Sequence, residues 1–106
     1  MTSSQATVDY ILDQISSLGE VRARKMFGDY ALYCNEKVVG LICEDQLFIK
    51  YTDAGKKFAK DRYTAGFAYK GARESMNVTD GVDDREFITA LVRLTADALP
   101  QPKVKK

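Results

Sequence analysis

Residues 30–51 read YALYCNEKVVGLICEDQLFIKY, and most of the predicted sheet lies in this segment. Two polar dipeptides, Asn35-Glu36 and Glu44-Asp45, divide it into three short runs of strand-forming residues. Asparagine tolerates the positive φ that a tight hairpin turn demands, so the first two runs are predicted to pair as an antiparallel hairpin. Because residues 22–27 read as a further strand before them, the sequence predicts four consecutive strands with short connections, which is an antiparallel meander.

Amphipathic helices are predicted on both sides of this meander. Apolar residues recur at helical spacing over 4–18, with a serine or threonine available as the cap and Gly19 suited to the end. A second helical pattern follows Asp83 and Glu86, whose spacing is that of an acidic capping box, and Pro100 stops it. Each helix carries one apolar stripe that must be buried.

Two shorter elements are predicted between the meander and the last helix. Asp53 can cap a short basic helix, and residues 75–79 alternate as a final strand. The expected order is therefore α-β-β-β-β-α-β-α, which is an α+β two-layer sandwich with a mainly antiparallel sheet. The helices are expected on one face of the sheet, because only that arrangement buries both stripes. The other face is left to water or to a partner.

The length of 106 residues predicts one domain over residues 1–100. The segment 101–106 is rich in lysine and has no apolar face, so it is predicted to be a disordered basic tail. No apolar run approaches the roughly 20 residues that a membrane span needs, and no secretory signal precedes the first helix. We therefore expect a cytoplasmic protein without membrane contact.

Catalytic and metal chemistry find little support in the composition. The chain has no histidine, which removes the Ser/His and Cys/His nucleophile arrangements and the usual nitrogen ligand of zinc or iron. Asp83, Asp84 and Glu86 lie at a predicted helix start, where carboxylates complement the positive end of the helix dipole. No glycine spacing matches a phosphate-binding loop. We expect no enzyme, no catalytic residue, no metal and no cofactor.

The two cysteines, Cys34 and Cys43, are predicted to be independent reduced thiols. A two-residue turn at Asn35-Glu36 puts Cys34 beside Lys37 and Cys43 across from residue 28. The two sulfurs then lie at opposite ends of the hairpin, and at about 3.3 Å per residue their separation exceeds the reach of a disulfide.

Basic residues form two clusters on a chain whose net charge is only +1. The candidate contacts for nucleic acid or a protein partner are Arg22, Arg24, Lys25, Lys56, Lys60 and Arg62. Tyrosines are interleaved with them. Basic side chains can bind a phosphate backbone, and aromatic rings can stack on exposed nucleobases. If nucleic acid binds, both clusters are expected to contact it together. A solvated charged surface with the aromatic rings in the core explains the same pattern, because acids are interspersed.

Strand alternation adds one expectation about the first cluster. Arg22 and Arg24 are expected on one face of the sheet and Lys25 on the other. Glycine at position 28 is expected to mark a bend between the first two strands.

The run VRARKMFGDYALY over residues 21–33 resembles the opening motif of the TfoX/Sxy N-terminal domain family, which is Arg-Lys-Met-Phe-Gly-Gly-Tyr-Gly-Leu-Tyr. Later segments of the family pattern are matched by 47–50, 67–69 and Met76, so the resemblance extends from about residue 6 to residue 99. The structural motif residues that it carries over are Met26, Phe27, Gly28, Tyr30, Leu32 and Tyr33. Asp29 and Ala31 replace glycines that are usual in the family.

The resemblance implies a two-layer domain and links the chain to regulators of competence genes in bacteria. Those regulators carry a second, helical domain, and this sequence matches the first one alone. The family offers no catalytic residue. One hypothesis is therefore a TfoX-like domain in transcriptional regulation that acts through protein contacts or weak nucleic-acid contacts. The alternative is a protein-interaction or homodimerising module that uses its uncovered sheet face or an edge strand and does not bind nucleic acid.

Overall fold

The computed structural model describes residues 4–26, 29–67, 71 and 73–99, without the side chain of Met26. Within these residues the helices are α1 (Gln5–Gln14), α2 (Asp53–Ala59) and α3 (Arg85–Ala98), with the short 3-10 turns η1 (Ser16–Leu18), η2 (Lys60–Arg62) and η3 (Thr79–Gly81). The strands are β1 (Val21–Met26), β2 (Asp29–Cys34), β3 (Lys37–Cys43), β4 (Gln46–Lys50), β5 (Ala65–Gly66) and β6 (Ser75–Asn77). The predictions for Phe27, Gly28 and the tail 101–106 fall outside the described residues.

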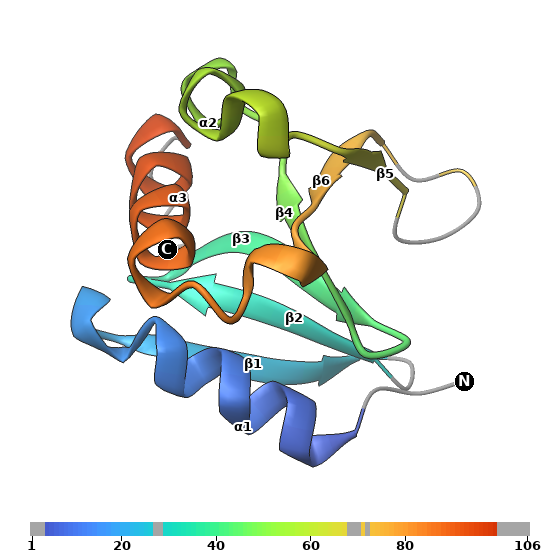
Figure 1. The fold of residues 1–106 in the computed structure, drawn as a ribbon. Helices are drawn as coiled ribbons and strands as arrows, with labels where there is room; N and C mark the ends of the chain where they lie inside the picture. Colours follow the sequence, from blue (N-terminus) through green and yellow to red (C-terminus); the bar gives the residue numbers. More distant parts are fainter. Residues whose placement is uncertain (1–3, 27–28, 68–70, 72, 100–106) are drawn as a thin grey trace, which may run out of the picture.

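The six strands form one antiparallel sheet in the order β1-β2-β3-β4-β6-β5 (Figure 1). The predicted α+β class and the predicted meander of four strands are confirmed. The order of elements differs from the prediction by one short strand, because β5 forms between the predicted short helix and the predicted final strand. The sheet then continues from β4 to β6, so β5 becomes the edge strand on that side.

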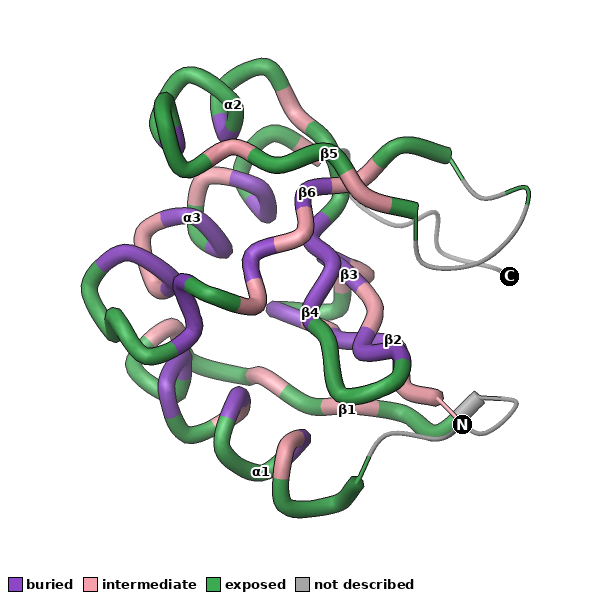
Figure 2. The backbone as a smooth tube through the Cα atoms, turned by 45° about the vertical axis from the view of Figure 1, so that its right-hand side comes forward, coloured by how far each residue is buried: buried purple, intermediate pink, exposed green. Residues whose placement is uncertain are grey.

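The helices cover one face of the sheet, as predicted (Figure 1). Buried side chains from the helices and the sheet form the core there: Val8 and Ile11 from α1, Ile15 just after it, Leu32, Ile42, Leu47, Ile49 and Met76 from the sheet, and Ile88, Leu91 and Val92 from α3. Figure 2 shows these buried segments gathered between the helices and the central strands, whereas β1 is partly or fully exposed.

Two tight turns connect the central strands. Asn35 and Glu36 have φ of 51° and 74°, and Glu44 and Asp45 have φ of 51° and 62°. Positive φ at both central residues is the geometry of a type I′ turn, whose twist matches that of the flanking strands. The hairpin predicted from Asn35-Glu36 is confirmed, because Cys34 and Lys37 are paired across it.

A β-bulge shifts the register within this hairpin. Tyr33 pairs with Val38, whereas Leu32 pairs with Gly40, so one extra residue enters β3. Gly40 meets this crowding without a side chain, because a Cβ there would lie 2.2 Å from the carbonyl oxygen of Phe48. Tyr30 pairs with Ile42, and continuing this register by one pair brings Cys43 across from Asp29, so the predicted position across from residue 28 is wrong by one. Both cysteines are nevertheless free, as predicted, and both are buried.

The helix caps differ in detail from the prediction. Ser4 caps α1 by accepting a hydrogen bond from the Thr7 backbone amide at 3.2 Å. However, α1 ends at Gln14, and after Ile15 the 3-10 turn η1 covers Ser16–Leu18. Thr52, not Asp53, caps α2, because the extended residue Thr52 accepts from the Gly55 amide.

Asp84, not Asp83, caps α3. The Asp84 carboxylate accepts from the Phe87 amide at 3.2 Å. The Asp83 carboxylate instead accepts from the hydroxyl of Tyr10 at 2.6 Å, which ties α1 to the segment before α3. The acidic dipeptide therefore serves structure at this position.

Candidate interaction surface

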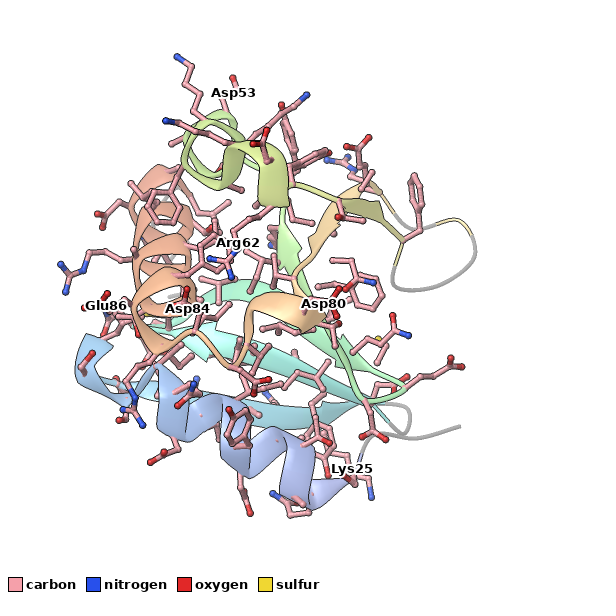
Figure 3. The ribbon with its side chains drawn as sticks, in the orientation of Figure 1. Lys25, Asp53, Arg62, Asp80, Asp84 and Glu86 are labelled. Carbon is pink, nitrogen blue, oxygen red and sulfur yellow. The ribbon has the colours of Figure 1, made fainter. Side chains whose placement is uncertain are left out.

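The basic residues of strand β1 lie on both faces of the sheet. Arg22 pairs with Tyr33 and Arg24 with Ala31, both of which alternate with the buried residue Leu32. The two arginines therefore project from the face that the helices leave uncovered. Lys25 pairs with Tyr30, whose hydroxyl donates to Gln5 of α1 at 3.3 Å, so Lys25 belongs to the helical face (Figure 3). The predicted alternation holds in this register.

Arg22 is held over its cross-strand neighbour. Its guanidinium carbon lies 4.7 Å from the centroid of the Tyr33 ring, which is a cation–π distance. The same guanidinium forms an ion pair at 3.5 Å with Glu36 in the hairpin turn, and the two side chains are 50% and 62% exposed. An ion pair this exposed contributes little and leaves the arginine available to another carboxylate.

Arg24 and Lys25 lie in the open. Both residues are exposed, and in the part of the chain that the structure describes neither joins an ion pair or a cation–π contact. With Arg22 they give β1 three positive charges and no negative one.

The uncovered face also carries a hollow of about 730 Å³. Its floor is apolar and consists of Val38, Leu41 and Phe48, of which Leu41 is paired with Ala31, the partner of Arg24. Lys50 and Arg73 add positive charge to its lining, and Glu74 adds negative charge. The β1 arginines and this hollow therefore share one face of the sheet.

The second predicted cluster surrounds α2. Tyr51, Asp53, Lys56, Lys57, Lys60 and Tyr63 line a hollow of about 490 Å³. The rings of Tyr51 and Tyr63 meet edge to face at 6.3 Å, and the ammonium of Lys56 lies 5.0 Å from the Tyr63 centroid. The Tyr51 hydroxyl donates to Asp53, which raises the pKa of Tyr51 above its ordinary value. Lysine side chains next to tyrosine rings can bind an anion or a nucleobase.

Arg62 has a different task from the lysines before it. Its guanidinium forms an ion pair with Asp84 at 3.1 Å and lies 3.9 Å from the centroid of Phe87 (Figure 3). Phe58 of α2 stacks on the same ring at 5.6 Å. Arg62 therefore joins η2 to the start of α3 through contacts within the domain. Its role as a contact residue for a partner stays a prediction.

The two basic clusters do not form one surface. Figures 1 and 2 both show α2 and β1 on opposite sides of the molecule, with α3 and the central strands between them. A single ligand that touches Arg22, Arg24 and Lys25 together with Lys56 and Lys60, as the sequence led us to expect, would have to wrap around the domain.

Catalytic and metal chemistry gain no support from the described residues. Among them, no group of three acidic, cysteine or histidine side chains is placed to hold a metal ion, and no buried side-chain polar atom is without a partner. Burial, with smaller effects of the Asp29 charge and hydrogen bond, raises the pKa of the Cys43 thiol to about 11. Burial also raises the pKa of Cys34. Protonated thiols are poor nucleophiles.

Comparison with known proteins identifies the family of the chain. The profile of the TfoX N-terminal domain matches residues 13–99. The chain belongs to the TfoX N-terminal domain family. This confirms the resemblance drawn from the motif over residues 21–33. The domain is also 38% identical over 106 residues to an uncharacterized 12.7 kDa protein in the trpE 5′ region of Spirochaeta aurantia, and the match covers the whole of this chain and 91% of that protein.

The motif residues of this TfoX N-terminal domain have separate places in the fold. Leu32 is buried in the core, Tyr30 bonds to α1, and Tyr33 lies under Arg22 on the uncovered face. Phe27, Gly28 and the Met26 side chain lie outside the described residues. The described part of the motif therefore forms the paired strands β1 and β2, and the arginines of β1 project from this pair.

The sequence also predicts that the protein makes no membrane contact. None of the helices in the described ranges combines the length and the apolar character needed to cross a bilayer.

Sequence reasoning missed part of the TfoX domain's uncovered face. Val38, Leu41 and Lys50 were not singled out as contact residues, although they line the hollow beside the β1 arginines. The alternation of inward and outward side chains along β3 and β4 could have identified these residues, because their neighbours Val39, Ile42 and Ile49 are buried. The bulge after Val38 obscured it by shifting the period within β3.

Proposed function

We propose that this TfoX N-terminal domain is a non-enzymatic regulatory domain of the bacterial cytoplasm. It acts in transcriptional regulation of the competence type by holding a protein partner on the uncovered face of its sheet. The observation that carries the proposal is the apolar-floored hollow on the same face as the β1 arginines. Apolar surface rimmed by charged side chains is typical of protein contacts.

The separation of the basic clusters favours a protein over nucleic acid. A duplex or a single strand draws most of its affinity from several phosphates bound along one path. Here the basic residues of the two clusters lie on opposite sides of the molecule, so one short path along the surface does not pass both. Neither cluster alone offers more than a few free cations.

Recovery of the partner from native cell extract tests this function. Tagged wild-type domain is expected to retain a protein partner after nuclease treatment, and Leu41→Glu in the floor of the hollow is expected to abolish recovery. Lys57→Glu on α2 is the matched control and should recover the partner normally. Far-UV circular dichroism checks that both variants are folded. Loss of the partner on nuclease treatment, or indifference to Leu41→Glu, would contradict the proposal.

The lysines of α2 support a second candidate function, which is weak contact with nucleic acid. Lys56, Lys57 and Lys60 surround a hollow that also presents Tyr51 and Tyr63, the arrangement in which bases stack and phosphates bind. Binding without sequence preference would then have a Kd on the order of 10⁻⁴–10⁻⁶ M at physiological salt. A mobility shift of labelled DNA or RNA at low salt tests it, and its absence would exclude this function.

A further inference from the structure

The sheet has one long edge, and it is β1. The edge strand on the other side, β5, has two residues, whereas β1 has six. Of the β1 residues whose burial is described, none is buried (Figure 2). An open edge of this length presents unpaired backbone groups to which another strand can add.

The register identifies the backbone groups that face outward. The Asn35 amide donates to the Glu20 carbonyl at 2.8 Å, so these two residues form a hydrogen-bonded pair just before the first registered pair of β1 and β2. Hydrogen-bonded and non-bonded pairs alternate along an antiparallel ladder. Residues 22, 24 and 26 are therefore bonded to β2, and the amides and carbonyls of Val21, Ala23 and Lys25 point away from the sheet. Within the described residues, no backbone hydrogen bond outside the helices and strands uses them.

The charges of the β1 side chains indicate what kind of strand can add to this edge. Arg22 and Arg24 project two residues apart from the uncovered face, and Lys25 lies on the helical face. A second copy of β1 would set these charges against their like, which is unfavourable for directly opposed residues. An acidic segment would set opposite charges across the new pair.

Building on the proposed function, we propose that the β1 edge receives an extended acidic segment of the protein partner as a seventh, antiparallel strand. Residues of that strand opposite Arg22 and Arg24 form non-hydrogen-bonded pairs, whose Cα atoms lie about 4.5 Å apart. A glutamate or aspartate at each position reaches the facing guanidinium, which binds a carboxylate through two parallel hydrogen bonds. The segment thus carries acids at positions i and i+2.

The residue between the two acids faces the helical side. It lies opposite Ala23, which with Val21 is partly buried and packed against the core. An apolar side chain extends that core by one strand, so the recognised pattern is acidic–apolar–acidic. Alternate side chains give the specificity, and the backbone bonds to Val21, Ala23 and Lys25 give sequence-independent affinity.

Glu36 competes for one of the two arginines. Its carboxylate lies 3.5 Å from the Arg22 guanidinium, so it takes up part of the hydrogen-bonding capacity of that arginine. Glu36→Gln is therefore expected to tighten binding by about two- to fivefold, in keeping with the small contribution of an exposed ion pair.

Backbone-modified peptides test the proposal on the wild-type domain. The probe is a fluorescein-labelled peptide, Thr-Val-Glu-Val-Glu-Val-Thr, followed by fluorescence anisotropy. Methylation of two valine amides, which would point at β1, is expected to weaken binding about tenfold or more. Methylation of the two glutamate amides, which would point away, should change the affinity by less than about threefold. Equal effects of the two methylations would overturn strand addition.

Charge reversal tests the side-chain pattern. Arg22→Glu with Arg24→Glu is expected to lose the glutamate peptide and to bind the same peptide with lysine at both glutamate positions. Lys56→Glu with Lys60→Glu on α2 is the matched control, and its affinity for the glutamate peptide should equal that of wild type. Loss of binding by the control, or a glutamine peptide that binds as well as the glutamate one, would contradict the acidic pattern.

The same β1 variant separates this inference from the proposed function. If a nuclease-resistant partner is recovered and Arg22→Glu with Arg24→Glu still binds it, the proposed function stands and strand addition at β1 is wrong. A dimer of the wild-type domain in sedimentation that the glutamate peptide dissociates would also overturn it, since a second copy would then be the occupant.

Discussion

The ammonium of Lys37 lies 2.6 Å from the carbonyl oxygen of Ala96, near the end of α3. It also donates to the carbonyl of Leu99 at 3.0 Å. The last carbonyls of a helix have no partner within the helix, and they form the negative end of its dipole. A lysine from the start of β3 thus supplies both hydrogen bonds and charge to the end of α3, and it joins the hairpin to the helical layer.

The first prediction follows from this contact. Lys37→Met keeps the aliphatic part of the side chain but loses two charge-assisted hydrogen bonds, so it should lower the free energy of unfolding by about 1–3 kcal/mol. Urea denaturation measures the change. Lys57→Met, at an exposed position of α2, is the control and should change it by less than about 0.5 kcal/mol. An unchanged midpoint for Lys37→Met would show that the contact does not stabilise α3.

The second prediction concerns the thiol of Cys43. With a pKa of about 11, caused first by burial and then by the Asp29 charge and hydrogen bond, this thiol is almost wholly protonated at pH 8. Its reaction with iodoacetamide in the folded protein should be about a hundredfold slower than that of an unperturbed thiol. Mass spectrometry of the unfolded, non-reduced protein should find both thiols free.

Asp29→Asn provides the matched test of the cause. Removal of the negative charge beside Cys43 should speed its alkylation severalfold at pH 8, because the thiolate is no longer opposed by that charge. Cys34, which does not have Asp29 among the causes of its raised pKa, serves as the internal control and should react as before. Equal acceleration of both cysteines would indicate a loosened fold instead.

The third prediction is a pH dependence at the start of α3. The hydrogen bond from the Phe87 amide, followed by the bond to Arg62, holds the pKa of Asp84 below its ordinary value. A carboxyl whose pKa is lower in the folded state stabilises the fold fully above its unfolded pKa, near 4 for aspartate, and loses that effect as the pH falls through the folded pKa.

Asp84→Asn isolates this dependence, because asparagine caps the helix but does not titrate. The urea midpoint of wild type should fall as the pH drops below about 4, and that of Asp84→Asn should fall less steeply. Asp80→Asn in η3 is the control and should retain the wild-type slope. Identical slopes for wild type and Asp84→Asn would contradict the prediction.

The strands could be predicted from the sequence because their signals are local. Asn35-Glu36 and Glu44-Asp45 take the positive φ that their place between apolar runs demands, and they fix two of the hairpins. Alternation alone then separated Arg22 and Arg24 from Lys25. Each of these inferences needed only a few neighbouring residues.

The rest depends on contacts between distant residues. The bulge that moved Cys43 arises where Gly40 meets the backbone of Phe48, and no local pattern announces it. Lys56 and Lys60 are separated from the basic residues of β1 because α2 follows β4, and β2 and β3 lie between β4 and β1 in the sheet. The contact of Lys37 with Ala96 spans 59 residues and left no signal near either one.

The last prediction sets the two basic clusters against each other. Because α2 and β1 lie on opposite sides of the domain, a nucleic acid that binds the α2 hollow would not reach Arg22 or Arg24. Each phosphate contact contributes about −0.9 to the slope of log affinity against log salt on duplex DNA. Lys56, Lys57 and Lys60 would then give a slope no steeper than about −3, and Lys56→Ala with Lys60→Ala should reduce its magnitude by about 2. Arg22→Ala with Arg24→Ala is the matched control and should leave the slope unchanged. A slope that falls equally with both pairs of substitutions would mean that one strand wraps around the domain and touches both clusters.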